Sequence, residues 1–196
     1  MPSTNDIQML DFIQHYDEIA FHYINGVWRD SFSDIFLPFM RKAKNWIPLY
    51  ACLLGYIYYF FKKDFIKIFF LIALTIVVTD LTSSHLLKKK IRRTRPCRET
   101  ELPYEAVKLI PCSPGFSFTS SHAANHYALA TILSLSIFRR KKGVQLAFFT
   151  WAALIAYAQV YVSVHYPFDI LCGSILGIGI ALLVNKAYGR FYHITT

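Results

Sequence analysis

The sequence predicts an all-α fold: a polytopic membrane bundle of about five transmembrane helices, preceded by an amphipathic helix at the membrane interface. Hydrophobic residues make up 55% of the 196 residues, aromatic residues make up 17%, and the mean hydropathy is +0.34. One water-soluble core of this size cannot bury so much apolar surface. The apolar residues also gather in segments that approach the roughly 20 residues needed to span a bilayer. We therefore expect an integral membrane protein.

Five apolar segments are candidates for the spanning helices, at about residues 46–61, 65–87, 117–138, 144–163 and 168–185. The first 45 residues mix apolar and acidic side chains, which favours an interfacial helix over a sixth span, with a plain polar extension as the alternative. No repeat or long linker divides the chain. We therefore expect one domain over residues 1–196, in which residues 1–45 form the interfacial region.

The connections between these segments sort onto two faces. Short basic connections at 62–67 and 139–143 share one face with the C-terminal tail, by alternation of the spans. The other face carries the N-terminal region, the long loop from residue 88 to about 116, and the connection near residues 163–167. The net charge of +9 suits anionic lipid headgroups or phosphorylated substrates better than nucleic acid, because the basic residues lie between apolar segments.

The first of three polar clusters on that second face lies at residues 86–99. Lys88 stands seven positions before Arg95, and Pro96 follows. A helix that ends near residue 90, with a loop stiffened by the proline, would let both cations approach one anion. An ordinary basic loop that contacts headgroups is the alternative interpretation.

The second cluster lies at residues 116–130. Thr119 or Ser120 can cap a helix start, and the first amides of that helix, with the positive end of its dipole, favour an anion. His122 in the first turn is placed to donate a proton to a leaving group. A capped helix with an interfacial histidine would explain the same residues.

The third cluster is the stretch YVSVHYPFDILCG, residues 161–173. Pro167 suits the first turn of a helix that re-enters the membrane. Asp169, four residues after His165, can accept a hydrogen bond from one imidazole nitrogen and leave the other as an attacking lone pair. A structural histidine in an interfacial turn is the alternative.

In their order and spacing, the three clusters resemble the type 2 phosphatidic acid phosphatase superfamily, the integral-membrane lipid phosphate phosphatases. The resemblance covers about residues 80–177, the expected catalytic core. The family's first motif, a lysine, six residues and Arg-Pro, is matched in full by Lys88, Arg95 and Pro96. The second, Pro-Ser-Gly-His, is met by Thr119, Ser120, Ser121 and His122. The third, Ser-Arg, five residues, His, three residues and Asp, is met by Ala158, Gln159, His165 and Asp169.

The resemblance implies a function for each matched residue. His165 would attack phosphorus and form a phosphohistidine, Asp169 would orient it, and His122 would protonate the leaving oxygen and then activate water. The phosphoryl oxygens would be held by Lys88, Arg95, Ser120, the backbone amide of Ser121, and Gln159. The resemblance implies no metal and no other cofactor.

Gln159 departs from the family, which has an arginine that helps hold the phosphate. A neutral amide donates hydrogen bonds but brings no charge, and an uncompensated loss of a charge-assisted contact costs about 1.5–3 kcal/mol. Arg92 and Arg93 are nearby candidates to compensate, and a weakened or retuned enzyme is the alternative.

Two cysteines and one aspartate have structural expectations of their own. Cys97 and Cys112 both lie in the long loop, and a disulfide between them would hold the first two motifs together if that face is oxidising. Asp80, within an apolar segment, is expected to bond a serine or threonine on a neighbouring helix rather than the substrate.

Two rival functions have some support in the sequence. His122 and His126 have the spacing of two ligands to one metal, which suggests a metalloenzyme, but the seven histidines include too few near the clusters for a di-iron site. The second rival function is that of a lipid or anion binder or transporter with weakened catalysis. It is suggested by Gln159, which stands where the family has an arginine.

The predicted activity is hydrolysis of a lipid phosphate or diphosphate, with the lipid and the bilayer as partners and no signal for an oligomeric state. Undecaprenyl pyrophosphate is the most economical substrate, followed by phosphatidylglycerol phosphate, phosphatidic acid and lipid A phosphate. We expect a bacterial inner membrane, the active site on the periplasmic face, and the C-terminus in the cytoplasm. The many cations of the second face would by themselves suggest the opposite orientation, but phosphate-binding cations report poorly on topology.

Overall fold

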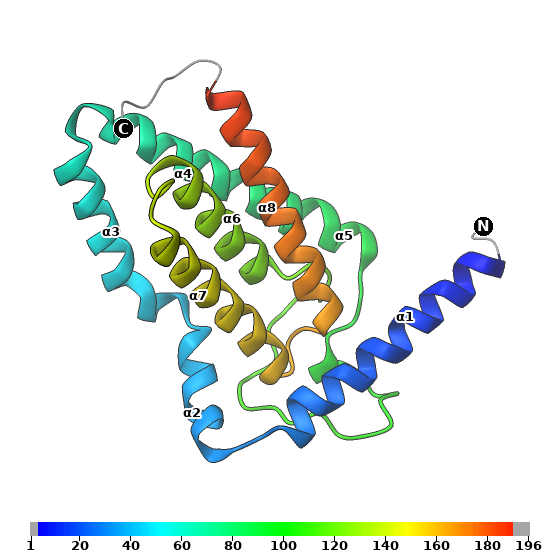
Figure 1. The fold of residues 1–196 in the computed structure, drawn as a ribbon. Coiled ribbons are helices and arrows are strands. Elements are labelled where there is room, and N and C mark those ends of the chain that lie inside the picture. Colours follow the sequence, from blue (N-terminus) through cyan, green and yellow to red (C-terminus); the bar gives the residue numbers. More distant parts are fainter. Residues whose placement is uncertain (1–3, 190–196) are drawn as a thin grey trace.

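The structure, a computed structural model, describes residues 4–189. Its described part is helical and contains no strand. The α-helices are α1 (Thr4–His22), α2 (Ser31–Met40), α3 (Ile47–Phe60), α4 (Phe65–Asp80), α5 (Lys88–Ile91), α6 (Ser121–Ser136), α7 (Lys142–Tyr161) and α8 (Pro167–Gly189). A π-helical stretch, Leu81–Leu87, joins α4 to α5 in one long rod (Figure 1).

Each of the five predicted apolar segments corresponds to a helix, so the predicted all-α membrane bundle is confirmed. Three helical stretches are long and apolar enough to cross a membrane: Lys62–Arg98, Lys142–Tyr161 and Pro167–Tyr188. Helices α3 and α6 have 14 and 16 residues, fewer than the roughly 20 of a typical span. The count of five spans therefore stays a prediction.

Helix α6 lies at the centre of the bundle, packed against α4, α7 and α8 (Figure 1). The turns at 61–64 and 137–141 lie at the same end of the bundle as the end of α8. The loops at 92–120 and 162–166 lie at the opposite end, where α6 and α8 begin. The three predicted motifs therefore meet at one end of the molecule.

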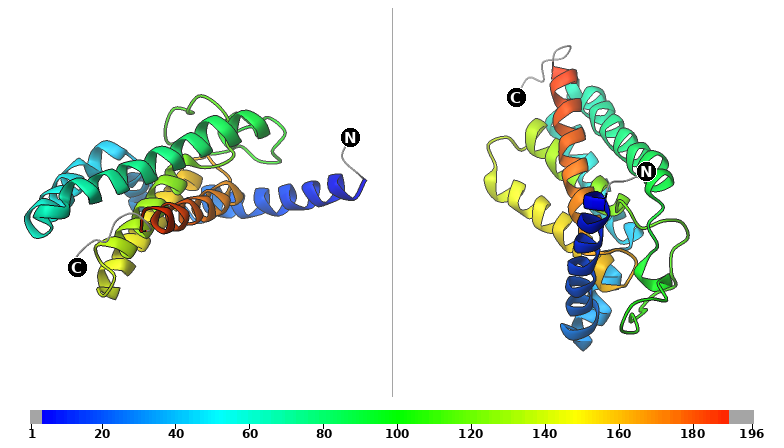
Figure 2. Two further views of the ribbon diagram at one scale, coloured as in Figure 1. Left: turned by 90° about the horizontal axis from the view of Figure 1, so that it is seen from above. Right: turned by 90° about the vertical axis from the view of Figure 1, so that its right-hand side faces the viewer.

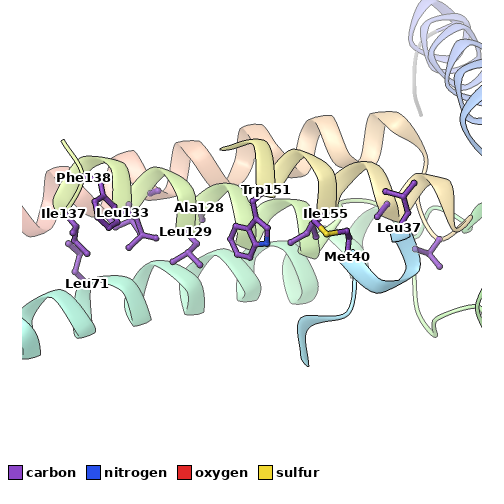
Figure 3. Close-up of a cluster of buried hydrophobic side chains, with 14 of the residues drawn as sticks. Leu37, Met40, Leu71, Ala128, Leu129, Leu133, Ile137, Phe138, Trp151 and Ile155 are labelled. Atoms are coloured by element: carbon purple, nitrogen blue, oxygen red, sulfur yellow. The ribbon is translucent and has the colours of Figure 1, made fainter. Parts of the chain in front are cut away.

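The buried core runs between α4, α6 and α7. Leu71, Leu129, Leu133 and Ile155 are at most 9% exposed and belong to one apolar cluster, which Trp151 joins (Figure 3). Outward-facing positions carry large apolar side chains as well, and Phe70 and Leu183 are among them. An apolar exterior around an apolar core suits a protein whose solvent is lipid.

Two glycines of α8 bring its backbone against α6. A Cβ atom at Gly173 would lie 2.6 Å from the carbonyl oxygen of Ser120, and one at Gly177 would collide with the carbonyl of Ala124. Small residues four positions apart allow helices to approach closely within membranes. This contact sets the start of α6 beside the start of α8.

The N-terminal region packs on the site end of the bundle, while α1 extends beyond it (Figure 2). Asp17 and Asn25 are buried, whereas Phe12 and Tyr16 are exposed. Asn25 donates to the carbonyls of Tyr161 and Val107 at 2.7 and 3.0 Å and accepts from the Val107 amide. These bonds join the π-helical stretch Tyr23–Val27, which follows α1, to the end of α7 and the long loop. The interfacial position of α1 stays a prediction.

Candidate active site

Backbone hydrogen bonds join the three motif segments to one another. The Cys97 amide donates to the carbonyl of Ser163 at 2.9 Å, and the Ser117 amide donates to the carbonyl of Arg93 at 2.8 Å. The Ser120 amide donates to the carbonyl of Asp169 at 3.1 Å. The site is therefore held by its backbone as well as by its side chains.

His165 lies at the centre of this junction, with only 2% of its surface exposed. Its Nδ1 is 3.5 Å from Asp169 Oδ2, and its Nε2 is 3.3 Å from Arg95 Nη1. Asp169 Oδ2 also accepts from the Tyr166 amide at 2.9 Å and from the Ser117 hydroxyl. The carboxylate is thus fixed, and it directs Nε2 of the ring toward the cations.

The protonation of His165 follows from its burial. Burial lowers the pKa of His165 to about 4, against the opposing effects of the Asp169 hydrogen bond and charge, and Arg95 lowers it further. The imidazole is therefore neutral near pH 7. A neutral ring with Nδ1 held by a carboxylate presents a lone pair at Nε2.

The two predicted cations of the first motif approach the histidines. Arg95 is buried, and it donates to the carbonyls of Val164 at 2.7 Å and Gly115 at 3.3 Å. Lys88, the first residue of α5, is half-buried, and its charge acts on Arg95 and on both His122 and His165. Helix α5 ends at Ile91, as the sequence predicted, because Arg92 turns left-handed at φ 55°.

The second motif forms the start of α6. Ser120 is the N-cap and its hydroxyl accepts from the Ala123 amide at 3.4 Å, which selects it over Thr119 as the predicted cap. His122 follows in the first turn. The hydroxyl of Ser121 bonds Ser83 and Ser84 at 2.9 Å each, which ties this turn to the π-helical stretch.

Gln159 is completely buried in α7 and has an unexpected partner. Its Oε1 accepts from Nε of Arg41, the residue that follows α2, at 3.3 Å. The two arginines that were candidates to compensate for Gln159 have other partners. Arg93 is bound to Asp169 at 2.8 Å and to Asp17 at 2.6 Å, and Arg92 is exposed, donating to the carbonyl of Lys89.

Sequence reasoning missed three contributors to the site, Asp17, Ser117 and Arg41. Asp17 Oδ1 accepts from the Phe168 amide at 2.7 Å, and its other oxygen binds Arg93, so α1 reaches Asp169 through one guanidinium. No motif spacing in the sequence relates these residues to the histidines. Their only local signal is charge or hydroxyl character within otherwise ordinary segments.

The two structural expectations have separate outcomes. Cys97 and Cys112 are joined in a disulfide, with their Cα atoms 5.9 Å apart. Asp80 accepts from Asn125 on the neighbouring α6 at 3.0 Å and from Ser84 at 3.4 Å. Its interhelical partner is therefore an amide and not the serine or threonine we expected.

His122 and His126 have neighbours that bear on the metal alternative. His126 Nδ1 contacts the carbonyl of His122 at 2.7 Å, and its Nε2 contacts the hydroxyl of Tyr50 at 3.3 Å. Within residues 4–189, no three His, Cys, Asp or Glu side chains form a metal-ligand group. His126 has the environment of a core histidine.

The part of the chain that carries the three motifs is similar to a known protein family. Residues 64–192, which include all three motif segments, match the PAP2 superfamily. The chain belongs to the PAP2 superfamily. The predicted family is therefore confirmed.

Known phosphatases are similar to this chain along most of its length. A lipid A 4'-phosphatase of Bacteroides thetaiotaomicron is 30% identical over 176 residues, covering 86% of this chain and 75% of that protein. An undecaprenyl-diphosphatase of Sulfolobus acidocaldarius is 28% identical over 169 residues, covering 86% and 72%.

Two solved structures share the fold. LpxE of Aquifex aeolicus superimposes with a TM-score of 0.64 at 26% identity, covering 85% of this chain and 92% of that one. A PAP2-type phosphatidylglycerolphosphate phosphatase of Bacillus subtilis gives a TM-score of 0.68 at 20% identity, covering 94% and 90%. At that identity the second likeness supports the fold alone.

An apolar groove leads away from the site of this PAP2 protein. It holds about 450 Å³ between α3, α4 and α6. His122, Ser121 and Asp80 lie among its lining residues, and the rest of the lining is mostly aliphatic, with Leu53, Leu54, Ile57, Ile72, Ile76 and Leu129. The groove therefore offers an apolar chain a path that ends beside His122.

Proposed function

We propose a two-step phosphoryl transfer through His165 for this chain, which is a lipid phosphatase of the PAP2 superfamily. Nε2 of His165 attacks phosphorus, the bond from phosphorus to the leaving oxygen breaks, and His122 gives that oxygen a proton. His122 then takes a proton from water, whose oxygen attacks phosphorus. The bond from phosphorus to Nε2 of His165 breaks, which releases inorganic phosphate and restores the free imidazole. The observation that carries the proposal is the neutral, buried His165, with Nδ1 toward Asp169 and Nε2 toward Arg95.

Charge around His165 supports the binding of a phosphoryl group. The hydrogen bonds of the Asp169 carboxylate go to Arg93, Ser117 and the Tyr166 amide, and no ion pair joins it to Lys88 or Arg95 within the described residues. These two cations, with Ser120, the Ser121 amide and Gln159, would hold the phosphoryl oxygens while charge develops on them. No step in this scheme requires a metal.

The groove supports a lipid as the leaving group. An acyl or prenyl tail lying between α3, α4 and α6 would bring its phosphate to the end of the bundle where His122 lies in the first turn of α6. Of the candidate lipids we place lipid A 4'-phosphate first, because two relatives, from Bacteroides thetaiotaomicron and Porphyromonas gingivalis, are lipid A 4'-phosphatases. Undecaprenyl diphosphate is second, on the similarity to the Sulfolobus protein.

The disulfide supports an oxidising location for the site. Disulfides persist in the periplasm and other oxidising compartments and are rare in the cytosol. We therefore propose an inner-membrane protein with the site end of the bundle on the periplasmic side. The end of α8 would then face the cytoplasm.

Phosphate release from a panel of lipids tests the proposal. Purified protein would be given lipid A, undecaprenyl diphosphate, phosphatidylglycerol phosphate and phosphatidic acid, each with His165→Ala as the matched inactive control. We expect release from lipid A, loss of the 4'-phosphate signal in its phosphorus NMR spectrum, and an acid-labile phosphoenzyme that His165→Ala lacks. Full activity in His165→Ala contradicts the mechanism, and binding without any release would make the chain a lipid-binding protein.

A further inference from the structure

Position 159 in this chain lacks the arginine of the family, yet a guanidinium is bound to it. Gln159 is completely buried, its Oε1 accepts from Arg41 Nε at 3.3 Å, and its Nε2 has no hydrogen-bond partner among the described residues. Its own carbonyl accepts from the amides of Val164 and His165 at 3.1 and 3.2 Å. Gln159 therefore supports the backbone of His165, the predicted nucleophile, and its side chain binds Arg41.

Arg41 is held firmly in this position by the turn that follows α2. Its amide donates to the carbonyl of Leu37 at 3.2 Å, and Trp46 Nε1 donates to the carbonyl of Met40 at 2.7 Å. Met40 is buried in the same apolar cluster as Ile155 of α7, as Figure 3 shows. The end of α2 is thus anchored to the helix that carries Gln159.

The charge of Arg41 has no carboxylate partner within residues 4–189. The ion pairs there engage Arg29, Lys67, Arg93 and His165, and none of them includes Arg41. Arg41 is half-buried, and burial lowers its pKa. Its charge also acts on His122 and on Arg95, so it lies within electrostatic reach of both sides of the site. A desolvated cation without a counter-ion is costly unless an anion binds beside it.

We propose that Arg41 binds the phosphoryl group in place of the family's third-motif arginine and that Gln159 is the positioning residue that aims its guanidinium. The inference rests on the proposed phosphoryl transfer and adds a residue to it. Arg41, in the N-terminal region and about 120 residues before Gln159, would supply the positive charge that the third motif lacks. The unpartnered Nε2 of Gln159 is free to donate to the same phosphoryl oxygens.

An exchange of the two residues tests this inference. We expect Arg41→Gln to lower kcat/KM by about 10- to 100-fold, the effect of one lost charged hydrogen bond. Gln159→Arg alone lowers kcat/KM, because it removes the amide that positions Arg41 and places a second cation against it. The double variant Arg41→Gln/Gln159→Arg restores one arginine to the site and recovers most of the activity. Lys42→Gln, which removes an exposed charge at the next position, leaves kcat/KM unchanged.

Vanadate, which adopts the trigonal-bipyramidal geometry of phosphoryl transfer, gives a readout that needs no turnover. We expect Arg41→Gln to abolish most of the rise in melting temperature that vanadate causes, and the double variant to restore it. Wild-type kcat/KM and vanadate response in Arg41→Gln, or a folded double variant no better than Arg41→Gln, would overturn the inference. If Arg41→Gln does not fold, Arg41→Met keeps an unbranched side chain and removes the charge, and a wild-type rate there would overturn the inference too.

The two proposals fail in different ways. If His165→Ala keeps its activity, the phosphohistidine mechanism is wrong. If His165→Ala is inactive while Arg41→Gln is fully active, the mechanism stands and only the assignment of Arg41 is wrong.

Discussion

His165 is buried in the protein, and this burial determines how the activity of the enzyme should depend on pH. Because burial lowers the pKa of His165 to about 4, the ring keeps its lone pair at pH values where an ordinary histidine is already charged. Asp169 limits this effect without reversing it.

The pH dependence of kcat/KM tests this protonation state. We expect the acid limb that belongs to His165 to lie near pH 4, since activity falls only as the ring gains a proton below its lowered pKa. The profile is measured with a monophosphate lipid and with a diphosphate lipid, because the phosphates of the two substrates titrate differently. An acid limb that comes from the substrate then differs between them, whereas one that comes from the enzyme does not. A limb near pH 6.5 shared by both substrates would contradict the expectation.

Arg93 bridges two buried carboxylates, Asp17 and Asp169, and its guanidinium lies 4.1 Å from the centre of the Tyr166 ring. Burial raises the pKa of Asp17 even with Arg93 beside it. We expect Arg93→Gln to destabilise the protein by about 3 kcal/mol or more, because two desolvated carboxylates lose their counter-ion.

Arg92→Gln is the matched control for Arg93→Gln, since it removes an exposed neighbouring charge. Melting temperatures of the two variants, measured in the same detergent, provide the comparison. Equal melting temperatures would show that the bridge contributes nothing to stability.

At the scale of elements, the contact between α6 and α8 depends on two glycines. Gly177 faces the carbonyl of Ala124, so a methyl group there must push the helices apart. We expect Gly177→Ala to cost about 1–3 kcal/mol or more, although alanine is the better helix former.

Gly179→Ala is the control for that change, because a Cβ at Gly179 would meet nothing within 4 Å. This variant should keep or slightly raise the melting temperature. A Gly177→Ala protein as stable as Gly179→Ala would show that the helices are not in close contact.

Most elements could be predicted from the sequence because the signals for them are local. The apolar segment at 144–163 corresponds to α7, Lys142–Tyr161, and Pro167 begins α8 where a proline in the first turn was expected. Helix α2 was not predicted as an element of its own, since its ten residues lie within a region that mixes apolar and acidic side chains and its place depends on contacts with α7.

At the scale of the whole molecule, the site was predictable only where its residues share a motif. The spacing of His165 and Asp169, or of Lys88 and Arg95, is a local pattern that the sequence displays. Arg41 and Asp17 reach the same place through tertiary packing of the N-terminal region, for which no spacing rule exists. Arg92 and Arg93, the candidates to compensate for Gln159, bond elsewhere in the structure, because nearness in sequence does not give the direction of a side chain.

The disulfide between Cys97 and Cys112 closes a loop across the site end of the whole bundle. We expect the double variant Cys97→Ser/Cys112→Ser to lose about 3 kcal/mol of stability, the effect of opening a loop of this length. Cys52→Ser, at an exposed free cysteine, is the matched control. Maleimide labelling of both Cys97 and Cys112 in unreduced native membranes would contradict the bond.

The groove between α3, α4 and α6 has a kinetic consequence. A substrate whose tail occupies that groove meets the enzyme by lateral diffusion within one leaflet. The rate should then follow the mole fraction of substrate among the surrounding lipids and not its molar concentration in the sample. Added inert phospholipid would slow the reaction by surface dilution, while the released phosphate would leave through water.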